Sequence, residues 1–231
     1  MSKIKDTLHY LSSFAGEQLI AHYQSKVGPD IEVCLINGRY QINAGSVNYS
    51  FGPLHDAFRR YFNIDPPLLD KAASILILGF GAGSVASILR MERNLPNHIT
   101  GVELDEMMVK AGQEHFDILK LMDVNIIIDD AYEFIQNNNR QFNLVIVDLY
   151  IDDKVPDKFM TENFIKEISR SLSPEGKLVF NKLTSDEKTT NELKYLEKTF
   201  NCFFEEVRTI KIPINKFAPN MMVTGMTKKK A

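Results

Sequence analysis

The residues best suited to chemistry stand where short apolar runs of the sequence end. Glu103 ends the run HITGVEL, Asp130 follows the run VNIII, and Asp148 ends the run NLVIVD. A glycine-rich loop over residues 79–84, GFGAGS, follows a fourth run, SILIL. Because the carboxyl ends of parallel strands lie at one edge of a sheet, we expect the three carboxylates and the loop to surround one pocket.

The glycine-rich loop has the pattern of a nucleotide site. Gly79, Gly81 and Gly83 alternate with other residues directly after an apolar run and before a helical pattern. Glycine allows a sharp turn and a close approach of a ligand to the backbone. The start of the helix then offers free N–H groups and the positive end of the helix dipole. A tight strand-to-helix turn without a ligand is the alternative interpretation.

Glu103 has the place of a ribose-binding residue. It lies 24 residues after Gly79 (103 − 79 = 24), where its carboxylate can accept two hydrogen bonds from a ribose diol. The alternative is a solvated carboxylate that precedes a helix. We expect Asp105, two residues further on, to be the N-cap of that helix.

Asp130 and Ala131 follow the next strand and point to the adenine end of a nucleotide. A carboxylate at this position can accept a hydrogen bond from the exocyclic amine of the base. Asp130 can equally be the N-cap of a helix over residues 131–138. Both interpretations place its carboxylate at the carboxyl edge of the sheet.

Asp148 is expected to face the reacting part of the ligand. Ligands of open α/β sheets bind outside the carboxyl ends of the strands, where the strand order reverses. A carboxylate there can orient or deprotonate an incoming amine. Tyr150 stands two positions later in the same loop and is the second candidate for a catalytic role. The alternative is a loop acid that caps the next helix.

The elements that position these residues alternate between strand and helix. Apolar runs predict strands over 74–79, 98–104, 124–128, 143–148 and 176–181, and helical patterns fall at 84–92, 105–119, 131–138, 162–172 and 189–200. This alternation predicts an α/β fold with a doubly wound, mostly parallel seven-stranded sheet. The last two strands, 202–210 and 220–227, have no helix between them and must pair as an antiparallel hairpin at one edge.

The first part of the chain has short strand-like runs. IEVCLI and RYQINA flank the dipeptide Asn-Gly, which accepts the positive φ angles of a type I′ turn and so predicts a hairpin. Residues 19–25 are a candidate third strand, and a helix begun by proline follows over 53–62. We therefore expect a small β-strand domain over residues 1–65 and a nucleotide-binding domain over 66–231.

Composition narrows the possible functions. The 231 residues carry a net charge of −3, so no global positive field attracts nucleic acid. No apolar run approaches the roughly 20 residues of a membrane span, and the first residues lack the apolar segment of a signal peptide. Two cysteines fit a reducing, cytoplasmic setting. The histidines show no metal-ligand spacing, so no metal is expected. His55 alone of the histidines stands near the expected site residues, and we interpret it as a surface histidine of a helix.

Together these motifs resemble the class I AdoMet-dependent methyltransferase fold. The resemblance includes the glycine loop, the acids that end successive strands, the segment LSPEGKLVF and the antiparallel last pair. A narrower resemblance is to the spermidine synthase family, which has a small β domain ahead of a methyltransferase-like domain. LINGRYQ is similar to the family's L-D-G-x-x-Q hairpin, and IIIDDAYEFI and NMMVTGMTK are similar to two of its later segments.

The family resemblance implies an enzyme that transfers an aminopropyl group from decarboxylated AdoMet to putrescine. In this sequence Glu103 would hold the ribose and Asp130 the adenine amine. Asp148 would match the family's catalytic acid, which takes a proton from the attacking amine. The family is usually oligomeric, so the resemblance also implies a homodimer.

The same resemblance assigns the residues that lie against the donor. These are Gly79, Gly81, Gly83 and Ala131, with Gln41 of the hairpin helping to cover the bound donor. No metal takes part in this set.

The sequence departs from the family pattern around the acceptor. Ile151 replaces the family's second acid, with Asp152 one place later, and Ala82 replaces an aspartate of the glycine loop. Residues 49–52, YSFG, replace the family's Y-H-E segment.

Three hypotheses about the function follow from the resemblance and these departures. One is an aminopropyltransferase-like enzyme that uses AdoMet or decarboxylated AdoMet and a small amine acceptor. The others are an AdoMet-dependent methyltransferase and a non-catalytic nucleotide-binding protein.

Overall fold

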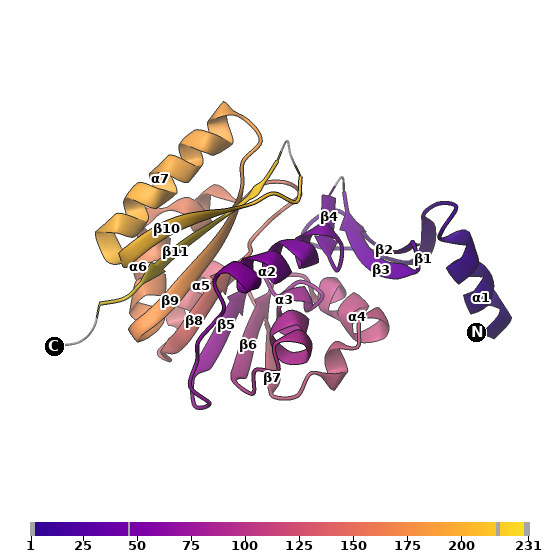
Figure 1. Cartoon of the computed structure of the whole chain (residues 1–231), viewed down its shortest axis with the longest axis horizontal. Helices are drawn as coiled ribbons and strands as arrows, with labels where there is room; N and C mark the ends of the chain where they lie inside the picture. The colour runs from indigo at the N-terminus through magenta and orange to yellow at the C-terminus, as the bar shows by residue number, and fades with distance from the viewer. Residues whose placement is uncertain (1–2, 46, 216–217, 229–231) are drawn as a thin grey trace.

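The structure is a computed structural model that describes residues 3–45, 47–215 and 218–228. The strands of its larger sheet are β5 (Ser74–Leu78), β6 (His98–Glu103), β7 (Val124–Ile128), β8 (Phe142–Val147), β9 (Leu172–Leu183), β10 (Glu205–Ile212) and β11 (Asn220–Met226). Their order is β10-β11-β9-β8-β5-β6-β7. The pairs from β9 to β7 are parallel, whereas β11 is antiparallel to both β9 and β10. The expected α/β class, the mostly parallel seven-stranded sheet and the antiparallel last pair are confirmed (Figure 1).

Helices cover both faces of this sheet. One face carries α2 (Pro53–Ile64), α3 (Ser84–Ser87), the π-helical turn η1 (Ile88–Glu92), α4 (Glu106–His115) and the short turn η2 (Ile118–Lys120). The other face carries α5 (Ala131–Asn137), the short turn η3 (Asp157–Met160), α6 (Glu162–Ser171) and α7 (Glu187–Phe203). Figure 1 shows the two layers on either side of the strands.

The alternation of side chains along β5 explains why a continuous apolar run marks a buried strand. Ile75 and Ile77 belong to the core under α2, whereas Leu76 and Leu78 belong to the core under α6. Successive residues of a strand point to opposite faces, so a strand with helices on both sides needs apolar residues at every position.

A second, smaller sheet precedes the large one. It contains β1 (Gln18–Tyr23), β2 (Ile31–Ile36), β3 (Arg39–Ala44) and β4 (Val47–Ser50) in that order, all antiparallel. Asn37 and Gly38 have φ angles of 49° and 73°, so the predicted type I′ hairpin is confirmed. The expectation of three strands was incomplete, because β4 adds a fourth.

The small sheet packs on the large domain beside the glycine-rich loop. Its buried side chains, among them Ile31, Ile42 and Ala44, form one cluster with Ala82 of the loop and with α4. The hydroxyl of Tyr23 on β1 donates a 2.6 Å hydrogen bond to Glu114 at the end of α4. The small sheet therefore reaches the edge of the large sheet where the predicted site residues stand.

A helix that the sequence analysis did not predict, α1 (Lys3–Ser12), lies at the start of the described chain. Its last turn leads to Ser13, which accepts hydrogen bonds from the N–H groups of Asn37 and Gly38 in the hairpin turn. The apolar stripe of α1 is not buried in a core: Leu8 and Leu11 are each 62% exposed. Residues 1–65 therefore include a helix and are not all strand-like.

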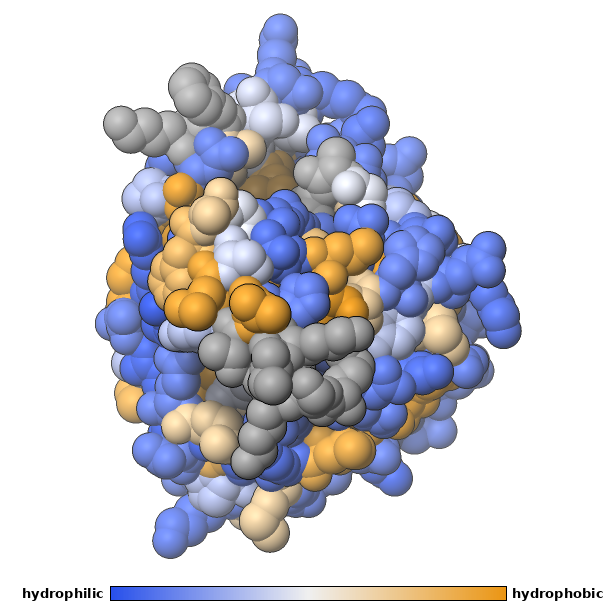
Figure 2. Space-filling view, turned by 90° about the vertical axis from the view of Figure 1, so that its right-hand side faces the viewer, coloured by the Kyte–Doolittle hydropathy of each residue, from blue (hydrophilic) through white to orange (hydrophobic). Residues whose placement is uncertain are grey.

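Figure 2 views the molecule from the side of α1 and the small sheet, and hydrophobic areas interrupt its polar surface. Exposed apolar side chains of this part of the chain include Leu8, Leu11, Phe14 and Leu19. Within the described residues, every helix is too short or too polar to cross a membrane.

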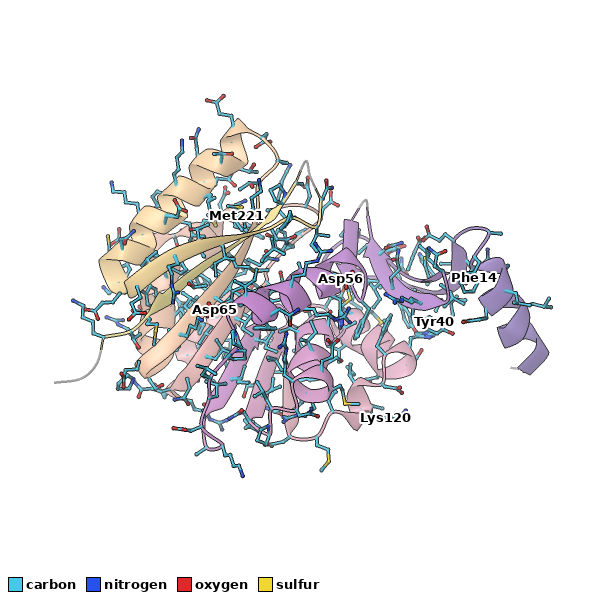
Figure 3. All side chains as sticks on the ribbon, viewed as in Figure 1. Phe14, Tyr40, Asp56, Asp65, Lys120 and Met221 are labelled. Atoms are coloured by element: carbon cyan, nitrogen blue, oxygen red, sulfur yellow. The ribbon has the colours of Figure 1, made fainter. Side chains whose placement is uncertain are left out.

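Helix α2 runs across the front of the large sheet. Asp56 and Asp65, labelled in Figure 3, mark its two ends. Its buried face carries Phe58 and Phe62, which join the core formed with β5 and η1. The predicted domain boundary at residue 65 stays a prediction, and α2 on its N-terminal side packs against the sheet of the C-terminal unit.

Several element limits differ from the expected ones for local reasons. The predicted helix over 84–92 changes to π-helical geometry after Ser87, and the predicted helix over 105–119 ends at His115. Helix α7 continues to Phe203, so β10 begins at Glu205 and not at residue 202. The run CFF has the composition of a strand, but its phenylalanines pack on the core from the last turn of the helix.

We predict that Phe58→Ala lowers the free energy of unfolding by about 3–5 kcal/mol, because it leaves a cavity under α2. Ile64→Ala on the same helix is the control, since Ile64 is 60% exposed. It should change stability by less than about 1 kcal/mol. Urea unfolding measures both values. Equal, small effects would contradict the packing of α2 on the large sheet.

Candidate active site

A cavity lies at the carboxyl ends of the parallel strands, between the large sheet and the small one. Predicted site residues that line it are Gly79, Gly81, Glu103, Asp130, Ala131, Asp148 and Tyr150. Ile31 and Ala44 of the small sheet complete one wall, and Lys158 and Phe159 of η3 complete another. The structure thus brings together the acids that end three successive strands, as the sequence predicts.

The loop after β5 is shaped by a close approach of two backbones. Gly79 has a φ of +84°, and a Cβ atom there would lie 2.1 Å from the carbonyl oxygen of Asp148. The N–H of Asp148 donates a 2.9 Å hydrogen bond to the carbonyl of Leu78. Glycine is therefore required at position 79 by the chain that carries Asp148, whether or not a ligand is bound.

Glu103 ties the glycine-rich loop to the end of β6. Its carboxylate accepts a 2.7 Å hydrogen bond from the N–H of Gly81 and a 2.9 Å hydrogen bond from the N–H of Asp105. Burial raises the pKa of Glu103, and hydrogen bonds from backbone N–H groups, those of Asp105 and Gly81 first among them, oppose this increase. The carboxylate stands at the cavity wall with acceptor capacity left, which suits a diol. Asp105 accepts from the N–H of Met107, so its predicted N-cap role is confirmed.

Asp130 caps α5 and forms an ion pair. Its carboxylate accepts a 2.8 Å hydrogen bond from the N–H of Tyr132, and its other oxygen pairs with Lys158. Burial raises the pKa of Asp130, but the ion pair and the N–H donors outweigh that effect and leave the pKa below its usual value. The capping role that the sequence left open is confirmed, and contact with an adenine amine stays a prediction.

Of the three carboxylates, Asp148 has the fewest hydrogen-bond donors to offset the cost of its burial. Burial raises its pKa to about 7, and the charge of Glu103 adds to the increase. One side-chain hydrogen bond opposes it, a 2.9 Å bond from the amide of Asn181 on β9. Asn181 is held in turn by the amide of Asn220 on β11 at 2.9 Å. The group can therefore take up or release a proton near neutral pH.

Tyr150 anchors the loop that follows Asp148. Its hydroxyl donates to the carbonyl of Asn181 at 3.0 Å and accepts from the N–H of Leu183 at 2.8 Å. Burial raises the pKa of this hydroxyl well above its usual value, so it stays protonated. These bonds fix Tyr150 to β9, and its predicted catalytic role stays a prediction.

Two predicted site residues lie outside the cavity lining. Gln41 on β3 donates to Asn43 of the same strand. Gly83 has a φ of +90° before α3, and a Cβ atom there would lie 2.6 Å from Cγ2 of Ile118. Their predicted contacts with a donor stay predictions.

The sequence analysis missed several residues of the cavity. Asn181 and Asn220 are buried and were not singled out, although Asn181 ends one predicted strand and Asn220 begins another. Lys158 comes from a short turn that no periodicity marks. His55, expected at the surface, has a side chain that is 12% exposed and bonded to Ser84 of the glycine-rich loop. That expectation was wrong because α2 packs against η1.

Among the described residues, we find no group of three histidine, cysteine or acidic side chains arranged as metal ligands.

Comparison with known proteins decides the family. Residues 66–231 match the model of the spermine/spermidine synthase domain. The chain belongs to the spermine/spermidine synthase family. The expected resemblance is thereby confirmed over the part of the chain that holds the large sheet and most of the cavity.

The proteins that are similar to this chain include some named as aminopropyltransferases and some named as methyltransferase homologs. A probable polyamine aminopropyl transferase of Bifidobacterium longum is 31% identical over 116 residues, which covers 50% of this chain and 25% of the relative. An eEF1A lysine and N-terminal methyltransferase homolog of Drosophila melanogaster is 26% identical over 148 residues, which covers 59% of this chain and 22% of the relative. The matched region is thus about a quarter of the length of these relatives.

The fold also matches a solved structure of the spermidine synthase type. A probable spermidine synthase from Corynebacterium glutamicum aligns with a TM-score of 0.74 at 21% identity, covering 90% of this chain and 80% of that chain. At this identity the likeness concerns the fold alone.

We predict that Asp148→Asn raises stability in a pH-dependent way. The folded protein holds the Asp148 proton up to about pH 7, whereas an unfolded aspartate releases it near about pH 3.9. Between these values the unfolded state binds fewer protons, so the wild-type free energy of unfolding falls as pH rises, by about 1.4 kcal/mol per unit for this group. The difference between variant and wild type should therefore grow from about pH 4 to about pH 7.

Urea unfolding at several pH values measures this difference. Asp70→Asn is the control, because it makes the same exchange at an exposed position outside the cavity lining. A difference for Asp148→Asn that is independent of pH would contradict a raised pKa at position 148.

Proposed function

We propose that this protein transfers an aminopropyl group from decarboxylated AdoMet to a small amine. The observation that carries the proposal is the position of Asp148. It is a buried carboxylate with a pKa of about 7, and it shares one cavity with Glu103. Membership of the spermine/spermidine synthase family supports the same reaction.

The donor's nucleoside fits the side of the cavity beyond β6. In the proposal Glu103 accepts hydrogen bonds from the ribose diol, and the loop after β5 supplies a close backbone wall. Asp130 and Ala131 stand at the end of β7, the next strand outward, where an adenine would follow the ribose. Lys158 adds a positive charge there that keeps the Asp130 carboxylate ionised and acceptor-only.

The acceptor fits beside Asp148, at the end of β8. The amine nitrogen attacks the carbon attached to the sulfonium sulfur. The C–S bond breaks, its electrons return to sulfur to give methylthioadenosine, and the proton lost by the nitrogen passes to Asp148. A carboxylate with a pKa near 7 is a better base for this step than an ordinary aspartate. Asn181 orients that carboxylate through its 2.9 Å hydrogen bond.

Methyl transfer from AdoMet to an amine is the second candidate, and the acceptor loop favours it. Ile151 is 45% exposed and offers no carboxylate for the far end of a diamine. A monofunctional amine needs a single base, which Asp148 can supply. The Drosophila relative, named as a lysine and N-terminal methyltransferase homolog, supports this candidate.

We also propose that the protein is cytoplasmic, that it uses no metal and that it forms a homodimer. Cys34 and Cys202 are both free thiols, which suits a reducing compartment. The exposed apolar side chains of α1 and β1 suit a surface covered by a second copy.

The donor is tested by calorimetric titration with AdoMet, decarboxylated AdoMet and methylthioadenosine. The proposal expects decarboxylated AdoMet to bind most tightly and to yield product with putrescine or another small amine. Preference for AdoMet would select methyl transfer. Absence of binding by all three at millimolar concentration would reject both transferase functions.

The role of Asp148 is tested with Asp148→Asn. The variant keeps the hydrogen bond with Asn181 but cannot accept a proton. Donor affinity should stay within a few-fold of wild type, while turnover falls by about 100-fold or more. Turnover equal to that of wild type would remove Asp148 from the role of base.

The role of Glu103 is tested with Glu103→Ala, read against the conservative Glu103→Gln. The alanine variant should weaken donor and methylthioadenosine alike, by about tenfold or more, because both ligands carry the ribose. The glutamine variant retains one acceptor and should lie between the alanine variant and wild type. Unchanged affinity in the alanine variant would place the ribose elsewhere.

A further inference from the structure

The cavity continues past Asp148, on the side away from the proposed nucleoside. In the large sheet β9 and β11 follow β8 on one side, whereas β6 and β7 lie on the other. Leu183 at the end of β9 and Asn220 at the start of β11 line this part of the cavity. Leu149 and Ile151, from the loop after β8, line it as well. We call this part the acceptor end of the cavity.

The polar side chains of the acceptor end are bonded to one another. The amide of Asn220 donates to Asn181 Oδ1 at 2.9 Å, and the amide of Asn181 donates to Asp148 at 2.9 Å. The Tyr150 hydroxyl is bonded to the carbonyl of Asn181 and to the N–H of Leu183. These side chains are uncharged, so the charge that an amine meets beside them is that of Asp148.

Two large apolar side chains of the cavity lining are exposed. Ile151 is 45% exposed, and Val27, in the loop between β1 and β2, is 44% exposed. Contact of apolar surface with water is unfavourable, and the gain on its removal is roughly proportional to the area covered. An apolar group of a ligand would therefore bind favourably here.

Asp152, the acid next to Ile151, lines the cavity but lies against the small sheet. Ile151 and Lys154 exchange two backbone hydrogen bonds, of 2.9 and 3.3 Å, and close a tight turn in which Asp152 has a φ of 57°. A Cβ at Gly45 would lie 3.2 Å from Asp152 Oδ1 and 3.2 Å from Cγ of Pro29. The carboxylate therefore lies at the turn between β3 and β4, at the rim of the cavity.

We infer that the acceptor is an amine with one charged nitrogen and an apolar tail, bound with its nitrogen at Asp148 and its tail against Ile151 and Leu183. The inference rests on the proposed function and names the class of acceptor within it. The nitrogen forms its bond to the donor carbon as the C–S bond breaks, and its proton passes to Asp148, so the tail takes no part in the chemistry. A second ammonium in place of the tail would lie among uncharged groups, which is costly for a charge without a partner.

Pentylamine and putrescine test the inference, because they differ only in a methyl group against a second ammonium. Each is titrated by calorimetry into protein saturated with methylthioadenosine, which fills the nucleoside side and leaves the acceptor end open. The titration is done at about pH 8, one unit above the pKa of Asp148. Wild type should bind pentylamine about tenfold or more tightly than putrescine. Equal or tighter binding of putrescine, or no binding of either amine, would overturn the inference.

Ile151→Asp should reverse the preference, because it adds a carboxylate where the tail lies. Putrescine should bind about tenfold or more tightly than to wild type, and pentylamine more weakly. Ile151→Asn is the matched control, since it is polar and of similar size but uncharged, and it should weaken pentylamine without strengthening putrescine. Both variants should bind methylthioadenosine within about twofold of wild type, which shows that they are folded. An unchanged ratio of the two amines in Ile151→Asp would overturn the inference.

Asp152→Asn examines the neighbouring acid in the same titration. It should leave the ratio of the two amines within about twofold of wild type. A selective loss of putrescine would give Asp152 the far end of a diamine and overturn the inference. The proposed function fails separately: wild type that binds pentylamine selectively, yet transfers no group to it from decarboxylated AdoMet or AdoMet, would reject the transferase and still support the class of amine.

Discussion

The close approach of the chains that leave β5 and β8 is the constraint on which the site depends. There is room for no side chain between them, since a Cβ at Gly79 would lie 2.1 Å from the Asp148 carbonyl oxygen. The contact brings Asp148 against the glycine-rich loop and away from water. Burial of this carboxylate then raises its pKa to about 7. The raised pKa of Asp148 therefore follows from backbone packing at the centre of the sheet.

The acids around the cavity differ in how their charge is compensated. Glu103 is bonded by two backbone N–H groups, and Asp130 is bonded by the start of α5 and by Lys158. Asp148 has a neutral amide from Asn181. A buried carboxylate with few donors is the one whose charged form costs most. The three carboxylates therefore differ in pKa because their surroundings differ.

The sequence predicted most strands of both sheets because their signals are local. In the large sheet the run SILIL fills both faces of β5, and in the small sheet Asn37 and Gly38 adopt the positive φ angles of a hairpin turn. It also predicted the acids of the site, since the end of a parallel strand has one place in such a fold. Contacts between distant segments carried no such signal. His55 and Ser84 are 29 residues apart, Asp148 and Asn181 are 33 apart, and only the packing of α2 and β9 brings each pair together.

The central claim is that Asp148 titrates near neutral pH inside the cavity. Carbon-13 NMR of aspartate carboxyl groups measures this directly, with the Asp148 signal assigned by its loss in Asp148→Asn. The account predicts a carboxyl shift that titrates with a midpoint near pH 7 in the ligand-free protein. A midpoint near about pH 4, the value of an ordinary aspartate, would contradict it.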